Sequence, residues 1–153
     1  MSDKIDEIPP KTFFTIAFLI SLIGAALLLI FDFGWFNASN YYLGVYIWGG
    51  IGAWNGLISL PILISAFLLL YCMGISLLVL KSPEKIPDKK YVTYGLYASV
   101  IVFILTIIGA IVFAVEMTLE DAWWNYDAGF YGAIIGSSVT AICFYFGLKK
   151  LEL

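Results

Sequence analysis

Three residue types are missing from this chain of 153 residues: it contains no histidine, no arginine and no glutamine. Charged residues make up only 12% of it, whereas a soluble domain carries about 25%. Without histidine the chain lacks the commonest general base and a frequent metal ligand. Only two cysteines are present, Cys72 and Cys143. Both fall in apolar runs, where cysteine usually acts as a small packing residue.

Hydrophobic residues, in contrast, make up 62% of the chain, and the mean hydropathy is +0.97. Too few polar groups remain to cover the surface of a soluble globule. The composition therefore indicates an integral membrane protein with a single membrane domain, 1–153.

Four stretches without a charged residue cover 12–31, 33–80, 91–115 and 128–148. About 20 apolar residues are enough for one helical span, so the first, third and fourth stretches fit one span each. The second is too long, and five glycines interrupt its first part, 33–55. We therefore predict spans at about 12–31, 56–80, 91–116 and 130–148. A pair of spans joined near Pro61 is the alternative for the second stretch.

The lysines indicate the orientation. With four spans, every lysine falls at a terminus or in the loop 81–90, all on one side of the membrane, whereas segments 32–55 and 117–129 contain acids and no lysine. Positive residues of short loops stay in the cytoplasm. We expect a multi-pass protein of the cell membrane with both termini cytoplasmic. A five-span arrangement would place the middle lysines outside.

The chain also contains an apparent internal repeat at an offset of 85 residues. The segment IAFLISLIGA, 16–25, matches IVFILTIIGA, 101–110. At the same offset Asn40, Tyr41 and Gly44 match Asn125, Tyr126 and Gly129. The offset contains two spans, so the halves share one orientation. This predicts an all-α bundle of four transmembrane helices, built from two parallel two-helix repeats.

Small residues predict where the helices meet, because membrane helices associate through close packing at such positions. Gly24 and Gly109 occupy matching places in the first and third spans. Gly132 and Gly136 form a GxxxG pattern in the fourth. We expect these four glycines to pack the helices of one chain against one another, with a dimer face as the alternative.

All five tryptophans lie in the predicted external segments or at their edge, rather than on both sides of the membrane as in an aromatic belt. Together with two tyrosines of the repeated motif they are candidates for a surface that binds a partner or lipid: Trp35, Trp48, Trp54, Trp123, Trp124, Tyr41 and Tyr126. We also expect the two external segments to form an ordered, aromatic-rich external cap on the bundle. Packing of these rings on one another within the cap, or anchoring at the membrane interface, is the alternative to a binding surface.

Signals for catalysis and cofactors are missing. There is no phosphate-binding glycine loop, no dinucleotide fingerprint and no zinc-ligand spacing. No charge falls in the middle of a span, where a proton or ion pathway would need one. We expect no enzyme activity, no catalytic residues, no cofactor and no metal. Without a basic stripe we also expect no nucleic-acid partner.

The layout resembles the claudin-like tetraspan proteins: four spans, cytoplasmic termini, a larger first external segment rich in tryptophan and a shorter second one. The Gly-Leu-Trp motif and paired cysteines of the claudin signature are not present in segment 32–55.

We therefore expect a non-enzymatic scaffold or accessory subunit that acts through its external aromatic surface and its helix faces. Its partners would be membrane lipids, another membrane protein or a second copy. A small transporter or channel built on the two-fold repeat is the alternative. A transporter needs a wet pathway lined by polar groups, whereas a scaffold needs only a dry, packed centre.

Overall fold

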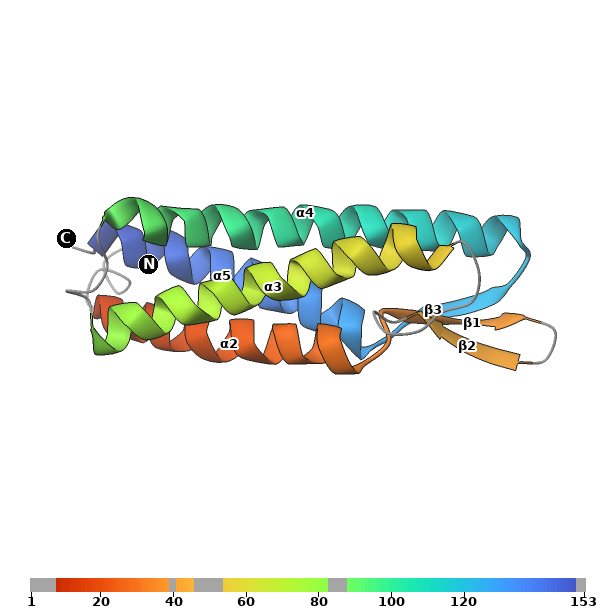
Figure 1. Ribbon diagram of the computed structural model, residues 1–153, viewed down its shortest axis with the longest axis horizontal. Helices are drawn as coiled ribbons and strands as arrows, with labels where there is room; N and C mark the ends of the chain where they lie inside the picture. Colours follow the sequence, from red (N-terminus) through yellow and green to blue (C-terminus); the bar gives the residue numbers. More distant parts are fainter. Residues whose placement is uncertain (1–7, 39–40, 46–53, 83–87, 151–153) are drawn as a thin grey trace.

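A computed structural model describes residues 8–38, 41–45, 54–82 and 88–150, with the backbone alone for 38, 41–45 and 54–59. Four helices fill most of it (Figure 1): α2 (Pro10–Ile30), α3 (Trp54–Lys81), α4 (Lys89–Leu119) and α5 (Ala128–Lys150). Three short strands lie together at one end of the bundle: β1 (Gly34–Ala38), β2 (Tyr41–Val45) and β3 (Trp123–Tyr126).

Each helix contains a segment that is long and apolar enough to cross a membrane: Pro10–Ile30, Leu60–Lys81, Lys89–Leu119 and Ala128–Lys150. The prediction of an all-α bundle with four membrane-spanning helices is confirmed. The chain is a multi-pass membrane protein. Pro61 lies inside α3 and does not divide it into two helices.

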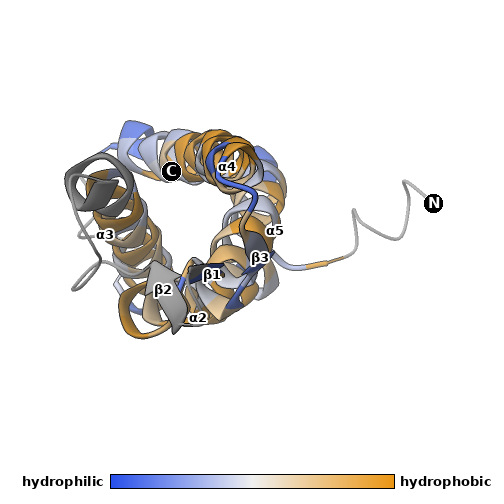
Figure 2. Ribbon diagram, turned by 90° about the vertical axis from the view of Figure 1, so that its right-hand side faces the viewer, coloured by the Kyte–Doolittle hydropathy of each residue, from blue (hydrophilic) through white to orange (hydrophobic). Residues whose placement is uncertain are grey.

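The helices form a ring in which α2 lies opposite α4 and α3 lies opposite α5, as the end-on view in Figure 2 shows. Large aliphatic side chains cover the outside of this ring, including Leu19, Ile23, Ile104, Ile111 and Ile135, all exposed. Such a surface is suited to lipid tails and unsuited to water. The arrangement therefore buries small and aromatic residues inside and presents branched aliphatic ones to the bilayer.

Aromatic rings and glycines lock the helices at the end of the bundle away from the sheet. The rings of Phe14 and Phe144 are fully buried and meet edge to face, with centroids 5.5 Å apart. A Cβ atom on Gly147 would lie 2.8 Å from the Phe14 ring, and one on Gly95 would overlap the Phe144 ring. Each glycine therefore leaves the space that a phenylalanine of a neighbouring helix occupies.

The buried faces of α2 and α4 follow the 85-residue offset of the predicted repeat. Every buried residue of α2 except Gly24 has a buried counterpart in α4. The α2 positions Phe13, Phe14, Ala17, Ser21, Ala25 and Leu28 correspond to Ala98, Ser99, Val102, Thr106, Ala110 and Phe113. The two helices thus turn the same face of the repeated pattern toward the bundle centre.

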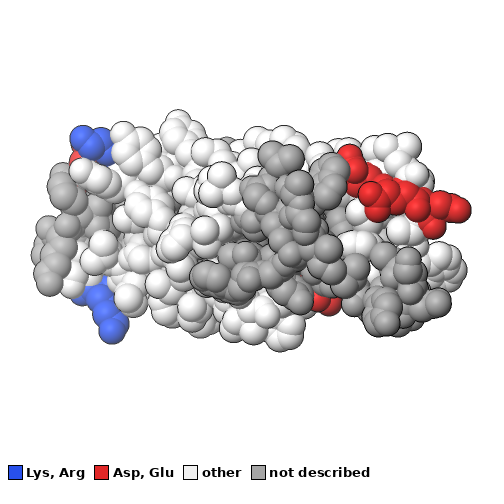
Figure 3. Space-filling model, turned by 45° about the vertical axis from the view of Figure 1, so that its right-hand side comes forward, with Lys and Arg blue, Asp and Glu red and all other residues white. Residues whose placement is uncertain are grey.

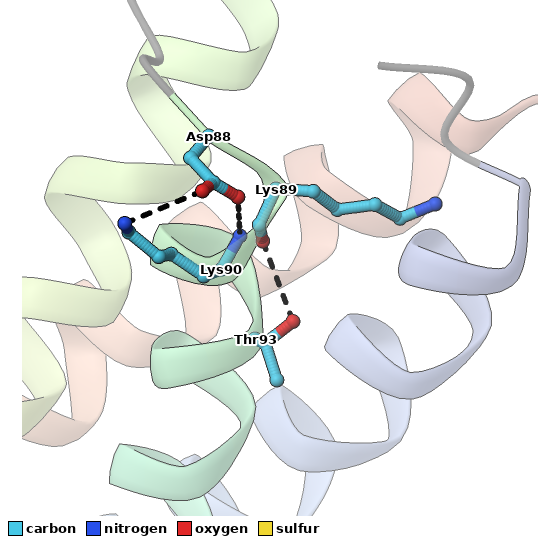
Figure 4. A network of polar contacts seen from close by, with 4 residues as sticks. All are labelled: Asp88, Lys89, Lys90 and Thr93. Atoms are coloured by element: carbon cyan, nitrogen blue, oxygen red, sulfur yellow. Dashed lines mark hydrogen bonds and ion pairs between the residues drawn. The ribbon is translucent and has the colours of Figure 1, made fainter.

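Polar groups fix the start of α4 at the end opposite the sheet, which we call the lysine end (Figure 4). Asp88 is the N-cap: its Oδ1 atom accepts a hydrogen bond of 2.8 Å from the backbone N–H of Lys90. Its Oδ2 atom lies 3.3 Å from Lys90 Nζ. The backbone N–H, more than the ammonium group, lowers the pKa of the Asp88 carboxyl below its ordinary value. Capping of this kind satisfies a donor that has no partner within the helix.

The three strands form an antiparallel sheet in the order β2-β1-β3. The sequence analysis did not predict this sheet. Segments 32–55 and 117–129 do not show the regular alternation of apolar and polar residues that would predict strands. Their backbone N–H and C=O groups nevertheless need hydrogen-bond partners wherever water is scarce. Pairing β1 with β3 satisfies these groups and joins the two segments that connect the spans at this end.

Candidate functional site

The sheet has two unlike faces, because side chains of a strand alternate between them. In β3 Trp123 and Asn125 are exposed, whereas Trp124 and Tyr126 are partly buried. Trp123 pairs with Asn37 of β1, and Asn125 pairs with Trp35. Residues directly opposite in a sheet share a face, so Trp35, Asn37, Trp123 and Asn125 make up one surface, called here the outer sheet face.

The opposite face holds the sheet on the bundle through an aromatic cluster. Phe113, fully buried on α4, contacts Trp124 edge to face with ring centroids 5.7 Å apart. The ring of Tyr126 stacks on Phe130 at 4.3 Å. Its hydroxyl donates a hydrogen bond of 2.9 Å to the carbonyl of Ala110. These contacts fix the position of β3 relative to two helices, and burial is the main reason that the pKa of Tyr126 is raised.

Two glycines permit this close seating. A Cβ atom on Gly34 would lie 2.8 Å from the Phe113 ring. One on Gly129 would lie 2.7 Å from the carbonyl oxygen of Asp32, which instead accepts a hydrogen bond of 2.9 Å from the Gly129 N–H. Any larger residue at either position would push the sheet or α5 away from its neighbour.

A tight turn directs the chain from α4 into β3. The N–H of Ala122 donates to Met117 O at 2.9 Å, and that of Asp121 donates to Thr118 O at 3.2 Å. This is the Schellman pattern that ends many helices, and it requires a left-handed residue at the position of Asp121. Asp121 has φ 53°, a conformation that aspartate tolerates better than most residues. The turn sets where the outer sheet face begins.

Trp123 is the most exposed aromatic residue among those whose side chains are described, with 82% of its surface accessible. Leu119, at the end of α4, is 78% exposed. Glu116, Glu120 and Asp121 lie on the same stretch of chain, and Figure 3 shows acidic side chains gathered at the sheet end, with lysines at the opposite end. The outer sheet face is therefore an aromatic surface beside negative charge.

A second pair of acids lies at the base of the sheet. Asp127 precedes α5, and its Oδ1 atom accepts a hydrogen bond of 2.7 Å from the N–H of Ala128. Partial burial, and to a lesser extent the charge of Asp127, raises the pKa of Asp32 above its ordinary value. Among the residues with described positions, no three histidine, cysteine or acidic side chains come together as a metal site.

The aromatic residues singled out from the sequence fall into three groups. Trp35 and Trp123 lie on the outer sheet face, whereas Trp124 and Tyr126 pack against the bundle. Tyr41 begins β2 opposite Ala38, and Trp54 begins α3, but their side chains lie outside the described part of the chain. Trp48 lies wholly outside it. The contribution of Asn37 and Asn125 to this surface was missed, because neither has a distinctive sequence pattern.

The repeated loop motif does not form two equivalent turns. Gly44 lies in β2, paired with Trp35, whereas Gly129 lies in the first turn of α5. The α4 helix also continues to Leu119, while α2 stops at Ile30, the counterpart of position 115. The similarity of the halves is thus seen in the buried faces of α2 and α4 and not in the segments that follow these helices.

The four predicted packing glycines behave unequally. A Cβ atom on Gly24 would lie 2.8 Å from Gly132 O and 3.2 Å from the Cα of Gly136. These three glycines therefore bring the backbones of α2 and α5 into direct contact. A Cβ atom on Gly109 would meet only the Phe33 ring, at 3.6 Å. Gly109 thus faces an aromatic ring at ordinary contact distance rather than a neighbouring backbone.

Fold and site together define a class of protein: a four-span membrane protein whose two connecting segments at one end join in a small sheet. Comparison of the chain with protein-family models, with curated proteins and with solved structures gave no match. The function must therefore be argued from the geometry of the chain itself.

Proposed function

We propose that the protein is a non-enzymatic scaffold or accessory subunit of the cell membrane, with both termini in the cytoplasm and the sheet end outside. It binds another membrane protein through the outer sheet face. The observation that carries this proposal is Trp123: a large ring, 82% exposed, on a strand that the inner aromatic cluster holds rigidly. Exposed tryptophans on fixed elements are frequent hot spots of protein interfaces.

The charge distribution supports this orientation. Every charge from 32 to 55 and from 116 to 127 is acidic, and every lysine lies at the other end of the chain's spans. Lysine-rich short loops face the cytoplasm. The acids beside Trp123 favour a protein partner over an anionic lipid surface, since like charges repel. A claudin-like layout, with a larger first external segment and a shorter second one, belongs to the same proposal.

The bundle interior supports a scaffold over a transporter. Its hydroxyl groups are buried, and most of those described bond within their own helix. Ser21 donates to Ala17 O at 2.6 Å, Thr106 to Val102 O at 2.7 Å and Ser137 to Ala133 O at 2.6 Å. A hydroxyl that is already paired to its own backbone, in tightly packed surroundings, does not supply the wet pathway that a transported polar solute needs.

Adjacent tryptophans provide a matched test. Trp123→Ala removes an exposed ring and should leave the melting temperature unchanged while the amount of partner recovered with the protein falls at least fivefold. Trp124→Ala removes a packed ring and should lower the melting temperature. Both variants and the original chain are expressed in the native membrane, purified in mild detergent, and their co-purifying proteins quantified.

The proposal fails if Trp123→Ala leaves every co-purifying protein at its original level. It also fails if Trp123→Ala lowers the melting temperature as much as Trp124→Ala, because the ring would then be part of the core. If Trp123→Ala changes only the association of the chain with a second copy of itself, as measured by light scattering, the partner at the outer sheet face is another copy of this chain and not a different protein.

A further inference from the structure

A cavity of about 120 Å³ lies between α3 and α4, in the half of the bundle nearer the sheet. Leu28 and Phe33 form its inner end and are nearly fully buried. Pro61 and Ile62 line it from α3, and Gly109 lines it from α4. Its lining is mainly apolar and comes from three helices and Phe33, with the hydroxyl residues Ser65 and Thr106 also among the lining residues.

Comparison of the two halves explains why the space exists. At the matching position of α2, Gly24 packs directly against the backbone of α5, with Gly132 O only 2.8 Å from where a Cβ would be, and it also lines an outer groove between the two helices. On α4, Gly109 meets nothing closer than the Phe33 ring at 3.6 Å. The neighbouring helix there contributes Pro61, whose ring interrupts regular helix packing, instead of a second glycine pair. The direct backbone contact that Gly24 makes with α5 thus has no counterpart at Gly109.

The cavity opens toward the membrane. Ile108 and Val112 stand at its rim and are 52% and 40% exposed on the outer surface of α4, within a segment apolar enough to span the bilayer. The Thr106 hydroxyl, which also lines it, is paired with Val102 O. The molecules that can enter this cavity from the membrane are therefore hydrocarbon tails. An empty apolar cavity is unfavourable, because the side chains of its walls lack dispersion contacts on that side.

We propose that this cavity binds one acyl chain of a membrane phospholipid, which fills the contact between α3 and α4. A helix of a partner protein is too wide, since packed helices approach only to 8–10 Å between axes. The volume is close to that of an apolar protein cavity of ~150 Å³ that takes up benzene, which suits a short length of a flexible chain. This inference is independent of the function proposed for the sheet.

The test reconstitutes the full chain into bilayers of phosphatidylcholine that carries a photoactivatable diazirine in one acyl chain. After illumination and chymotryptic digestion, mass spectrometry maps the lipid adducts. Gly109→Leu fills the cavity with a side chain. Gly74→Leu is the matched control, because a Cβ atom at Gly74 meets nothing within 4 Å and that glycine is not among the residues lining the cavity.

We expect adducts on the cavity residues at least five times more often than on Leu19 and Ile104, which are exposed on α2 and α4. Gly109→Leu should reduce the cavity adducts at least fivefold, and Gly74→Leu should leave them unchanged. Equal labelling of cavity and exposed positions, or adducts that survive Gly109→Leu, would overturn the proposal. If Gly109→Leu does not fold, Ser65→Leu fills the same space from α3, with the same expected loss.

Discussion

Two glycines at matching positions of similar helices meet different surroundings. Gly24→Ala would place a methyl group 2.8 Å from Gly132 O, and neither backbone can move aside cheaply. We expect a loss of about 1–3 kcal/mol in the free energy of unfolding, as for other overpacked sites. Gly109→Ala meets only a ring at 3.6 Å and should gain about 0.5–1 kcal/mol through helix propensity. Thermal unfolding of both variants in the same detergent measures the contrast, and a similar effect of the two would contradict the packing described.

Asp32 gives a pH dependence with a definite sign. Its pKa in the folded protein lies above the ordinary value of 3.8, because of partial burial and the charge of Asp127. The folded state therefore holds this proton to higher pH than the unfolded chain, so the contribution of Asp32 to stability decreases as pH rises from about 3.8 through the folded pKa. Asp32→Asn cannot ionise and should raise the melting temperature at pH 7.

The melting temperature of Asp32→Asn should also vary less between pH 4 and 7 than that of the original chain. Glu120→Gln, at an exposed acid of the same end, serves as the control and should preserve the original pH profile. A profile that is identical for the original chain and Asp32→Asn would show that burial at this site has no effect on stability.

At the scale of elements, the pairing of β1 with β3 joins two segments that are distant in the sequence. Asn37 and Trp123 are directly opposite, and opposite Cα atoms in antiparallel strands lie within disulfide range. The double variant Asn37→Cys/Trp123→Cys should therefore form a disulfide on mild oxidation. Asn37→Cys/Asn125→Cys, a diagonal pair about 7–8 Å apart, should not. The native cysteines are buried, so they should not interfere with cross-linking of the introduced pair. Gel mobility with and without reductant measures the disulfide. Equal cross-linking of both pairs would refute this register.

The helices were predictable from the sequence and the sheet was not, for a physical reason. A membrane span can be recognised from one continuous segment of sequence, because a run such as 91–115 must be apolar throughout to cross the hydrocarbon core. The strands Gly34–Ala38 and Trp123–Tyr126 are short, and their partners are fixed only once the bundle has positioned the segments that follow α2 and α4. For the same reason the aromatic residues could be listed from the sequence, but the division between exposed Trp123 and packed Trp124 required the pairing of β3.

The protein has two unlike ends connected by a bundle of four apolar helices. The lysine end contains the start of α2, the end of α3, the start of α4 and the end of α5 (Figure 1). The sheet end contains the outer sheet face. Acidic side chains gather at this end (Figure 3). The proposed function needs these ends on opposite sides of the membrane, with the sheet outside.

Accessibility of single cysteines to a membrane-impermeant maleimide tests this claim most directly. Lys81→Cys places a thiol at the lysine end, and Asp121→Cys places one at the sheet end. In intact cells we expect labelling of Asp121→Cys alone, with Lys81→Cys labelled only after the membrane is permeabilised. Labelling of Lys81→Cys in intact cells, or protection of Asp121→Cys until permeabilisation, would contradict the orientation and the proposed role of the outer sheet face.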